Sequence, residues 1–67
     1  MTATHFFEFD GNEYKTTARF DTALQTYVCN FYKKVDYTWI NYGEQRMAIQ
    51  GKTAIGHAIA YREHCGY

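Results

Sequence analysis

The sequence contains a weak internal repeat with an offset of thirty-one residues. Segment 22–24 (Thr-Ala-Leu) opens one apolar stretch, and segment 53–55 (Thr-Ala-Ile) opens another. Upstream of these segments, Glu13 recurs at the same offset as Glu44, and each glutamate sits in a candidate β-hairpin. The repeat therefore predicts the order hairpin, helix, hairpin, helix, which uses residues 1–67 as one compact domain.

Aromatic residues dominate the apolar part of the chain. Seven tyrosines, five phenylalanines and one tryptophan make up 19% of the 67 residues, whereas there are only two cysteines. A domain this small buries only roughly 60% of the surface of its unfolded chain, and two cysteines exclude a disulfide scaffold. Because so small a core cannot enclose all of these rings, we expect some of them to face solvent or a partner.

The formal net charge is zero, from seven basic and seven acidic residues. This balance argues against a histone-like binder of polyanions. It also favours self-association, because repulsion between copies is weak, and a homodimer is therefore one prediction. No stretch approaches the roughly 18 apolar residues of a membrane-spanning helix, and no secretory leader is evident. We expect a cytoplasmic protein with reduced thiols and no membrane partner.

The first third of the chain predicts a β-hairpin. Residues 5–9 form the first strand, residues 10–12 (Asp-Gly-Asn) supply the positive φ angles of a tight turn, and residues 13–19 form the return strand. Alternation along the return strand places one set of side chains on the inner face: Tyr14, Thr16 and Ala18. The alternate set faces away from the core: Lys15, Thr17 and Arg19.

An amphipathic helix of about three turns is predicted within residues 20–35, with Asp21 or Thr22 as its cap. Its apolar residues recur at helical spacing and fall on one stripe: Phe20, Leu24, Tyr27, Val28, Phe31 and Val35. Two lysines near its end suit the negative end of the helix dipole.

A second hairpin is predicted from a strand over 37–42, a turn at 43–45 and a return strand over 46–50. From these elements we predict the following core residues: Phe7, Phe9, Tyr14, Leu24, Tyr27, Val28, Phe31, Met47 and Ile49.

The segment 53–65 fits two descriptions. As a helix it has Thr53 as its cap and Gly66 just beyond its end; as a strand its apolar residues alternate. Its alanines and the internal repeat favour the helix. The predicted fold class is α+β with two layers, an antiparallel four-stranded sheet with helices on one face (ββαββα), and the alternative is ββαβββ.

Possible catalytic and metal-binding residues have simpler structural explanations. Segment 51–53 (Gly-Lys-Thr) lacks the first glycine of a phosphate-binding loop, because Arg46 stands five positions before Gly51. His57 and His64 are seven residues apart, whereas a helical zinc pair needs a spacing of four. Cys29 is expected on the flank of the helix over 20–35, partly exposed and with no histidine nearby. We therefore expect no catalytic residues, no cofactor and no metal site.

The strongest functional signal lies on the predicted sheet. If both helices cover one face, the other face must present aromatic and basic side chains together, which is the composition of binding hot spots. The predicted partner-binding residues are Phe6, Lys15, Arg19, Tyr37, Trp39 and Arg46. The alternative for Trp39 is that it turns inward and Ile40 outward, because the only tryptophan of a small domain is often in the core.

The layout resembles small phage-encoded inhibitors of host machinery, of which the anti-CRISPR proteins are a group. Several of these present a short hairpin and then a helix that follows a strand ending in a small residue, as segment 17–21 (Thr-Ala-Arg-Phe-Asp) does here. The resemblance covers most of the chain but rests on layout, and it carries over no individual contact residue. It implies an inhibitor in a host cytoplasm that blocks a protein or ribonucleoprotein complex by occupying its surface.

Two functions are therefore predicted from different classes. The first is a non-enzymatic protein that docks on a protein partner through the aromatic and basic face. The alternative is a nucleic-acid-binding module in which Phe6, Tyr37 and Trp39 stack on bases while Lys15, Arg19 and Arg46 hold phosphates. An enzyme is disfavoured, because no nucleophile, base and ligand set can be assembled.

Overall fold

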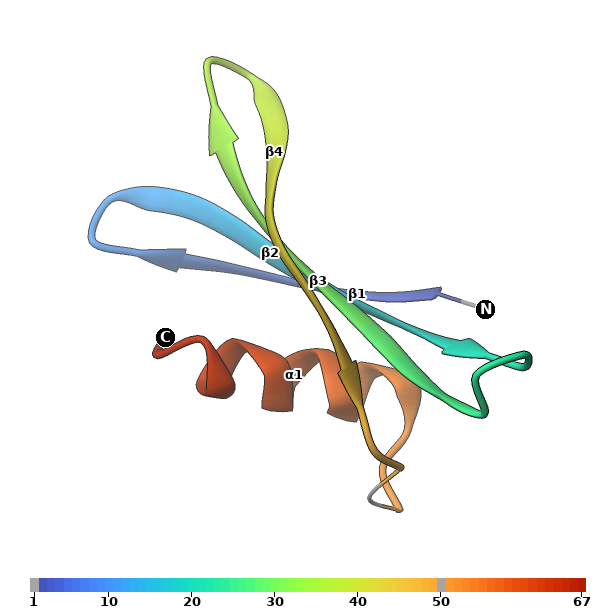
Figure 1. The fold of residues 1–67 in the computed structure, drawn as a ribbon. Coiled ribbons are helices and arrows are strands. Elements are labelled where there is room, and N and C mark those ends of the chain that lie inside the picture. Colours follow the sequence, from blue (N-terminus) through green and yellow to red (C-terminus); the bar gives the residue numbers. More distant parts are fainter. Residues whose placement is uncertain (1, 50) are drawn as a thin grey trace.

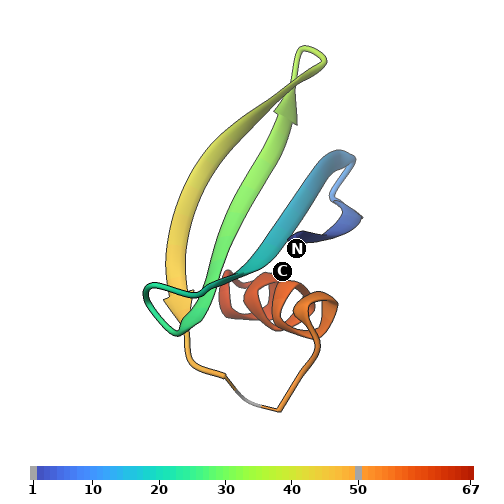
Figure 2. The ribbon, with the colours of Figure 1, turned by 90° about the vertical axis from the view of Figure 1, so that its right-hand side faces the viewer.

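The computed structural model describes residues 2–49 and 51–67 as a four-stranded antiparallel sheet followed by one helix (Figure 1). The elements are β1 (Thr2–Phe9), β2 (Asn12–Asp21), β3 (Thr26–Val35), β4 (Thr38–Met47) and α1 (Ala54–His64). Each strand pairs with the next along the chain, in the order β1-β2-β3-β4. The helix α1 lies across one face of the sheet, against β1, β2 and β3 (Figure 2). The predicted α+β class and antiparallel four-stranded sheet are confirmed, but the order is ββββα, not ββαββα or ββαβββ.

The first hairpin forms as predicted. β1 and β2 pair in a register that sets Phe7 opposite Tyr14 and Phe9 opposite Asn12. Asp10 and Gly11 make the turn, and both have positive φ angles, of 54° and 79°. Two consecutive positive φ angles match the right-handed twist of the flanking strands, which explains why an Asp-Gly pair closes this hairpin.

The predicted helix over 20–35 is wrong. The segment contains the end of β2, a turn at 22–25 and the whole of β3. The Asp21 carboxylate, expected to cap a helix, instead accepts a hydrogen bond from the Leu24 N–H at 3.0 Å and closes the turn, and Gln25 completes it with a φ of 54°. β3 is the strand between β2 and β4 and is hydrogen-bonded on both sides. The hydrogen bonds to both neighbouring strands stabilise residues 26–35 as a strand, although the spacing of their apolar side chains also fits a helix.

The predicted second hairpin is also placed wrongly. Its turn lies at Asp36 and Tyr37, whose φ angles are 49° and 66°, and β4 then runs without a break through the expected turn at 43–45. The register jumps from Phe31 opposite Gly43 to Tyr32 opposite Asn41, so Tyr42 is an extra residue that forms a β-bulge. Of the predicted return strand, residue 50 lies outside the described residues.

The C-terminal helix is confirmed, and the strand alternative for 53–65 is wrong. Thr53 is the N-cap, and its hydroxyl accepts a hydrogen bond from the Gly56 N–H at 3.2 Å. At the other end, Gly66 has a φ of 90° and the Tyr67 N–H donates to the Arg62 carbonyl at 3.1 Å. These bonds satisfy backbone groups that a helix end leaves free. This helix is too short and too polar to span a membrane, and it is the only helix in the described residues.

The core lies between α1 and the sheet face that it covers. Its buried residues are Tyr14, Ala18, Cys29, Phe31, Ala58 and Tyr61, and Phe7, Tyr27, Met47 and Cys65 pack against them. Three predicted core residues are instead exposed, namely Phe9 at 47%, Leu24 at 41% and Ile49 at 56%. Leu24 is exposed because it lies in a turn and not on a helix face. Val28 is buried as predicted, but alternation with Cys29 puts it on the opposite face of the sheet.

Candidate functional site

The face of the sheet turned away from α1, here called the helix-free face, is built from alternate residues of all four strands. Strand pairing sets Phe6 of β1 opposite Lys15 of β2, Lys15 opposite Tyr32 of β3, and Tyr32 opposite Asn41 of β4. The next row towards the β3–β4 turn contains Glu8, Glu13, Lys34 and Trp39. Side chains in adjacent rows of one face are near neighbours.

Five side chains of these rows form a contact group, the aromatic–lysine cluster: Phe6, Lys15, Tyr32, Lys34 and Trp39. The rings of Phe6 and Trp39 lie 6.0 Å apart at 52°. The Lys15 ammonium lies 4.8 Å from the ring centre of Tyr32 and 4.8 Å from that of Trp39, while Lys34 lies 5.8 Å from the Trp39 ring. Such cation–π contacts contribute roughly 0.5–1 kcal/mol each at exposed sites. They place Trp39 on the helix-free face, so its inward alternative is wrong.

Phe6 is the most exposed residue of this cluster. Its side chain is 64% exposed, although it contacts Trp39 and lies opposite Lys15 in the sheet. Its neighbour Phe7 points to the other side and packs against the core. Phe6 thus packs against Trp39 but leaves most of its surface in solvent, and an exposed apolar group within an aromatic cluster is typical of a contact surface.

The predicted arginines lie at the opposite end of the helix-free face. Arg19 and Arg46 both sit opposite Val28, one on each side, and Val28 is only 3% exposed between them. Arg19 also forms an ion pair with Asp21 at 3.3 Å. A row with Thr17 and Asn30 separates the arginines from the cluster. The structure therefore does not arrange the arginines around the aromatic residues as predicted.

Tyr37 lies apart from both groups, in the turn between β3 and β4. It is 95% exposed and has a positive φ of 66°. Together with Glu13, Lys34 and Asp36 it lines an open, charged hollow of about 300 Å³. Of the six predicted residues, three are in contact (Phe6, Lys15 and Trp39), and Tyr37 lies beyond the row that contains Trp39.

The charges of the helix-free face are balanced and partly paired. Its basic residues on the described strands are Lys15, Arg19, Lys34 and Arg46, and its acidic residues are Glu8, Glu13, Asp21 and Glu44. Lys34 pairs with Glu13 at 3.6 Å. The lysines are also held against aromatic rings. This face therefore lacks the excess of positive charge that a phosphate-binding surface needs.

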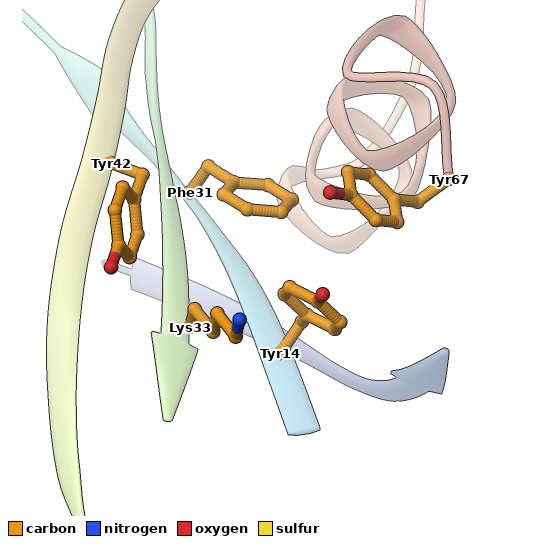
Figure 3. A pocket seen from close by; sticks show the side chains of 5 residues that line it. All are labelled: Tyr14, Phe31, Lys33, Tyr42 and Tyr67. Atoms are coloured by element: carbon orange, nitrogen blue, oxygen red, sulfur yellow. The ribbon is translucent and has the colours of Figure 1, made fainter. Parts of the chain in front are cut away.

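A second concave feature lies on the helix side of the sheet, beyond the C-terminal end of α1 (Figure 3). It has a volume of about 270 Å³ and is lined by Tyr14, Phe31, Lys33, Tyr42 and Tyr67. Lys33 forms no ion pair with any residue that the structure describes. A lone ammonium among aromatic rings suits a carboxylate on an apolar body. Sequence reasoning missed this pocket because it placed Phe31 and Lys33 in a helix and not on a strand.

The aromatic residues of this pocket are tightly packed around Tyr67. Its ring lies 5.0 Å from that of Tyr14 and 5.2 Å from that of Phe31. The pKa of the Tyr67 hydroxyl is raised, mainly by a hydrogen bond with Tyr14. Arg62 of α1 lies over the Phe7 ring at 4.3 Å and donates to the Tyr67 carbonyl. The end of the chain thus completes one wall of the pocket.

Cys29 and His57 are both buried. Cys29 is fully buried, contrary to the expected partial exposure, and burial raises the pKa of its thiol to about 11, which keeps the nucleophilic thiolate scarce. His57 is also fully buried and stacks on Tyr27 at 3.9 Å. Its Nδ1 donates to the Thr53 carbonyl, and its Nε2 has no partner in the described part of the chain. Within residues 2–49 and 51–67, no group of three His, Cys, Asp or Glu side chains gathers as a metal site.

Comparison with known proteins adds no relative. No family model, no curated protein sequence and no solved structure matches this chain. A function must therefore be argued from the residues themselves.

Proposed function

We propose that this protein is a small non-enzymatic binding module that docks on a protein partner through the aromatic–lysine cluster of its helix-free face. The observation that supports this proposal is the exposed Phe6 ring, 64% accessible, beside a Trp39 that is held by Lys15. Aromatic side chains that are fixed before binding lose little entropy in a complex, so they contribute more of their buried area to affinity.

The charge pattern favours a protein partner over a nucleic acid. At each end of the face a basic residue is paired with an acidic neighbour, Lys34 with Glu13 and Arg19 with Asp21. Those carboxylates would approach the phosphates of a bound strand and oppose binding. A protein partner whose surface carries both signs of charge can form ion pairs with these basic and acidic residues. The nucleic-acid module therefore stays the second hypothesis.

The narrowest form of the proposal is an inhibitor that occupies the surface of a host protein or ribonucleoprotein complex. Part of the layout that suggested it, a helix directly after segment 17–21, is a turn followed by β3 in the structure. What supports this form now is the sheet face that α1 leaves uncovered, on which Phe6 is exposed.

Affinity capture with matched variants tests the proposal. The parent protein, Phe6→Ser and Ile59→Ser would be used to capture partners from a host lysate treated with nuclease. Phe6 and Ile59 are both exposed apolar residues, but Ile59 lies on α1 and is 40% exposed. We expect Phe6→Ser to lose the captured protein and Ile59→Ser to retain it, with both variants folded by circular dichroism.

Two results would contradict the proposal. Equal capture by the parent and Phe6→Ser would place the working surface elsewhere. Capture that disappears with nuclease and falls steeply between low and moderate salt would support the nucleic-acid module, because counterion release makes phosphate contacts strongly salt-dependent.

A further inference from the structure

The outer edge of β4 is an open strand edge. Among the residues that the structure describes, β4 pairs only with β3, and Figure 2 shows it as the outermost strand on its side of the sheet. An open edge presents free N–H and C=O groups that another strand can satisfy, and proteins often block such edges with proline or lysine. β4 contains neither residue, and its bulge at Tyr42 disturbs only the half that follows the β3–β4 turn. Segment 43–47 is therefore a regular edge, and its charged residues are Glu44 and Arg46.

The two charged residues of β4 are arranged for pairing with a second copy. Glu44 and Arg46 are both exposed on the helix-free face, and neither forms an ion pair with a residue that the structure describes. When two identical strands pair in antiparallel fashion, one residue lies opposite its own copy. With Gln45 in that position, Glu44 of each chain lies directly opposite Arg46 of the other.

Other registers are opposed by the same two charges. A shift by one two-residue step in either direction sets Glu44 opposite Glu44 or Arg46 opposite Arg46, and like charges directly opposite one another are destabilising. A shift by one residue would set a side chain of the helix-free face of one copy opposite a side chain of the helix side of the other. A two-fold symmetric antiparallel pair does not allow that arrangement. The charges of β4 thus select the register around Gln45.

We propose that β4 pairs with β4 of a second copy of this chain, antiparallel about Gln45, and closes a two-fold symmetric dimer. The product is one continuous sheet with four strands from each copy and both helices on the same face. The other open edge, β1, carries only Glu8 as a charged residue. Two copies of β1 would therefore gain no contact between opposite charges. Pairing of β1 with β4 would be a head-to-tail contact, which builds rings or open filaments and not a two-fold dimer.

The dimer uses a surface different from the proposed partner site. The dimer contact is centred on Gln45, whereas the cluster reaches β4 only at Trp39, on the other side of the bulge at Tyr42, and its Phe6 lies on β1. Dimerisation would place two helix-free faces side by side. Failure of one proposal leaves the other standing, because variants at Glu44 and Arg46 do not alter the aromatic–lysine cluster.

Charge-exchange variants test the dimer by sedimentation velocity. The parent should sediment at twice the mass of the 7.9 kDa chain. Glu44→Arg alone and Arg46→Glu alone each turn both ion pairs into like-charge contacts, and should weaken the dimer by roughly tenfold or more. A mixture of the two single variants restores both opposite-charge contacts and should give a heterodimer. The double variant should dimerise like the parent.

Two controls change the net charge by the same amounts at other places. Glu63→Arg on α1 matches Glu44→Arg, and Arg19→Glu on β2 matches Arg46→Glu; both wild-type side chains are exposed, and neither lies on β4. Both controls should dimerise like the parent. A variant that loses the circular dichroism spectrum of the parent would be replaced by Glu44→Gln or Arg46→Gln, which should weaken the dimer more mildly.

Several outcomes would overturn the dimer proposal. A monomeric parent at high micromolar concentration rules out the contact. A dimer that persists in both single variants, or in both glutamine variants, lies at another surface. Single variants that remain monomeric when mixed would show that Glu44 and Arg46 do not face one another across the interface.

Discussion

The hydroxyl of Thr16 donates a hydrogen bond to the Ala58 carbonyl at 2.7 Å, and both residues are fully buried. Thr16 is in the centre of β2, and Ala58 is in the middle of α1. Forty-two positions separate them in the sequence. This bond joins the sheet to the helix at the point where their backbones come close, and the small side chain of Ala58 allows that approach.

Replacement of Thr16 by valine should destabilise the protein without a change of shape. Valine keeps the volume of threonine but removes the donor, so the expected cost is about 1 kcal/mol, the net contribution of one hydrogen bond. Thr17→Val is the matched control, because Thr17 points to the opposite face. Urea denaturation would measure both. A Thr16→Val variant as stable as Thr17→Val would show that the bond contributes nothing to stability.

Leu24→Ala and Phe31→Ala should differ sharply in stability. Phe31 is 8% exposed in the core, and its truncation should cost roughly 3–5 kcal/mol. Leu24 is 41% exposed in the turn before β3, so its truncation should cost less than about 1 kcal/mol. If residues 20–35 formed the helix predicted from the sequence, both losses would be large. Thermal melts of the two variants would therefore also test the assignment of β3.

Asp21 should make the free energy of unfolding depend on pH in the acidic range. The Leu24 N–H, and after it the Arg19 guanidinium, holds the pKa of the Asp21 carboxyl below its usual value of 3.8. A lowered pKa in the folded state means that the carboxylate adds stability above the unfolded pKa, and this stability is lost as the pH falls through the folded pKa. Asp21→Asn should reduce this acid dependence. Denaturation at several pH values between neutrality and strong acid would measure it, and an unchanged profile would contradict the prediction.

Cys29 should resist thiol reagents in the folded protein. Burial raises its pKa to about 11, and the side chain has no exposed surface. The raised pKa also means that its neutral thiol favours folding fully below the unfolded pKa of 9.0, and that this contribution is lost as the pH rises through about 11. Labelling with an aromatic disulfide at pH 8 should modify Cys65 first. Cys65→Ala isolates Cys29, which should then react only after denaturant is added. Rapid labelling of that variant in its native state would contradict the assigned burial.

Local patterns predicted the hairpin of β1 and β2 and the helix α1, whereas β3 and β4 depended on distant partners. The Asp10–Gly11 turn and the Thr53 cap are short-range signals that the structure confirms. β3 has apolar residues at a spacing that also fits a helix, and only its pairing with β2 and β4 decides the outcome. The turn at Tyr37 has no sequence signal, because tyrosine is uncommon at positive φ.

The candidate site was predicted in part, and in part for the wrong reason. Phe6 and Lys15 were placed correctly on the helix-free face, because alternation within a tight hairpin is a local property. Trp39 and Arg46 do share that face, but the prediction relied on a turn between them that does not exist. They share it because the bulge at Tyr42 shifts the alternation by one residue. The contact between Phe6 and Trp39 crosses the whole sheet and has no sequence signal.

The bulge at Tyr42 allows β4 to lose one residue without exchanging the side chains that its two faces display. Loss of the single codon for Tyr42 would remove the extra residue and restore strict alternation along the strand. With the C-terminal half of β4 held in place below α1, Asn41 would then adjoin Gly43 and stay opposite Tyr32, so Trp39 would remain on the helix-free face. A single-codon deletion elsewhere in a regular strand would exchange the faces of everything beyond it, whereas at Tyr42 the same deletion would leave both faces of the sheet unchanged.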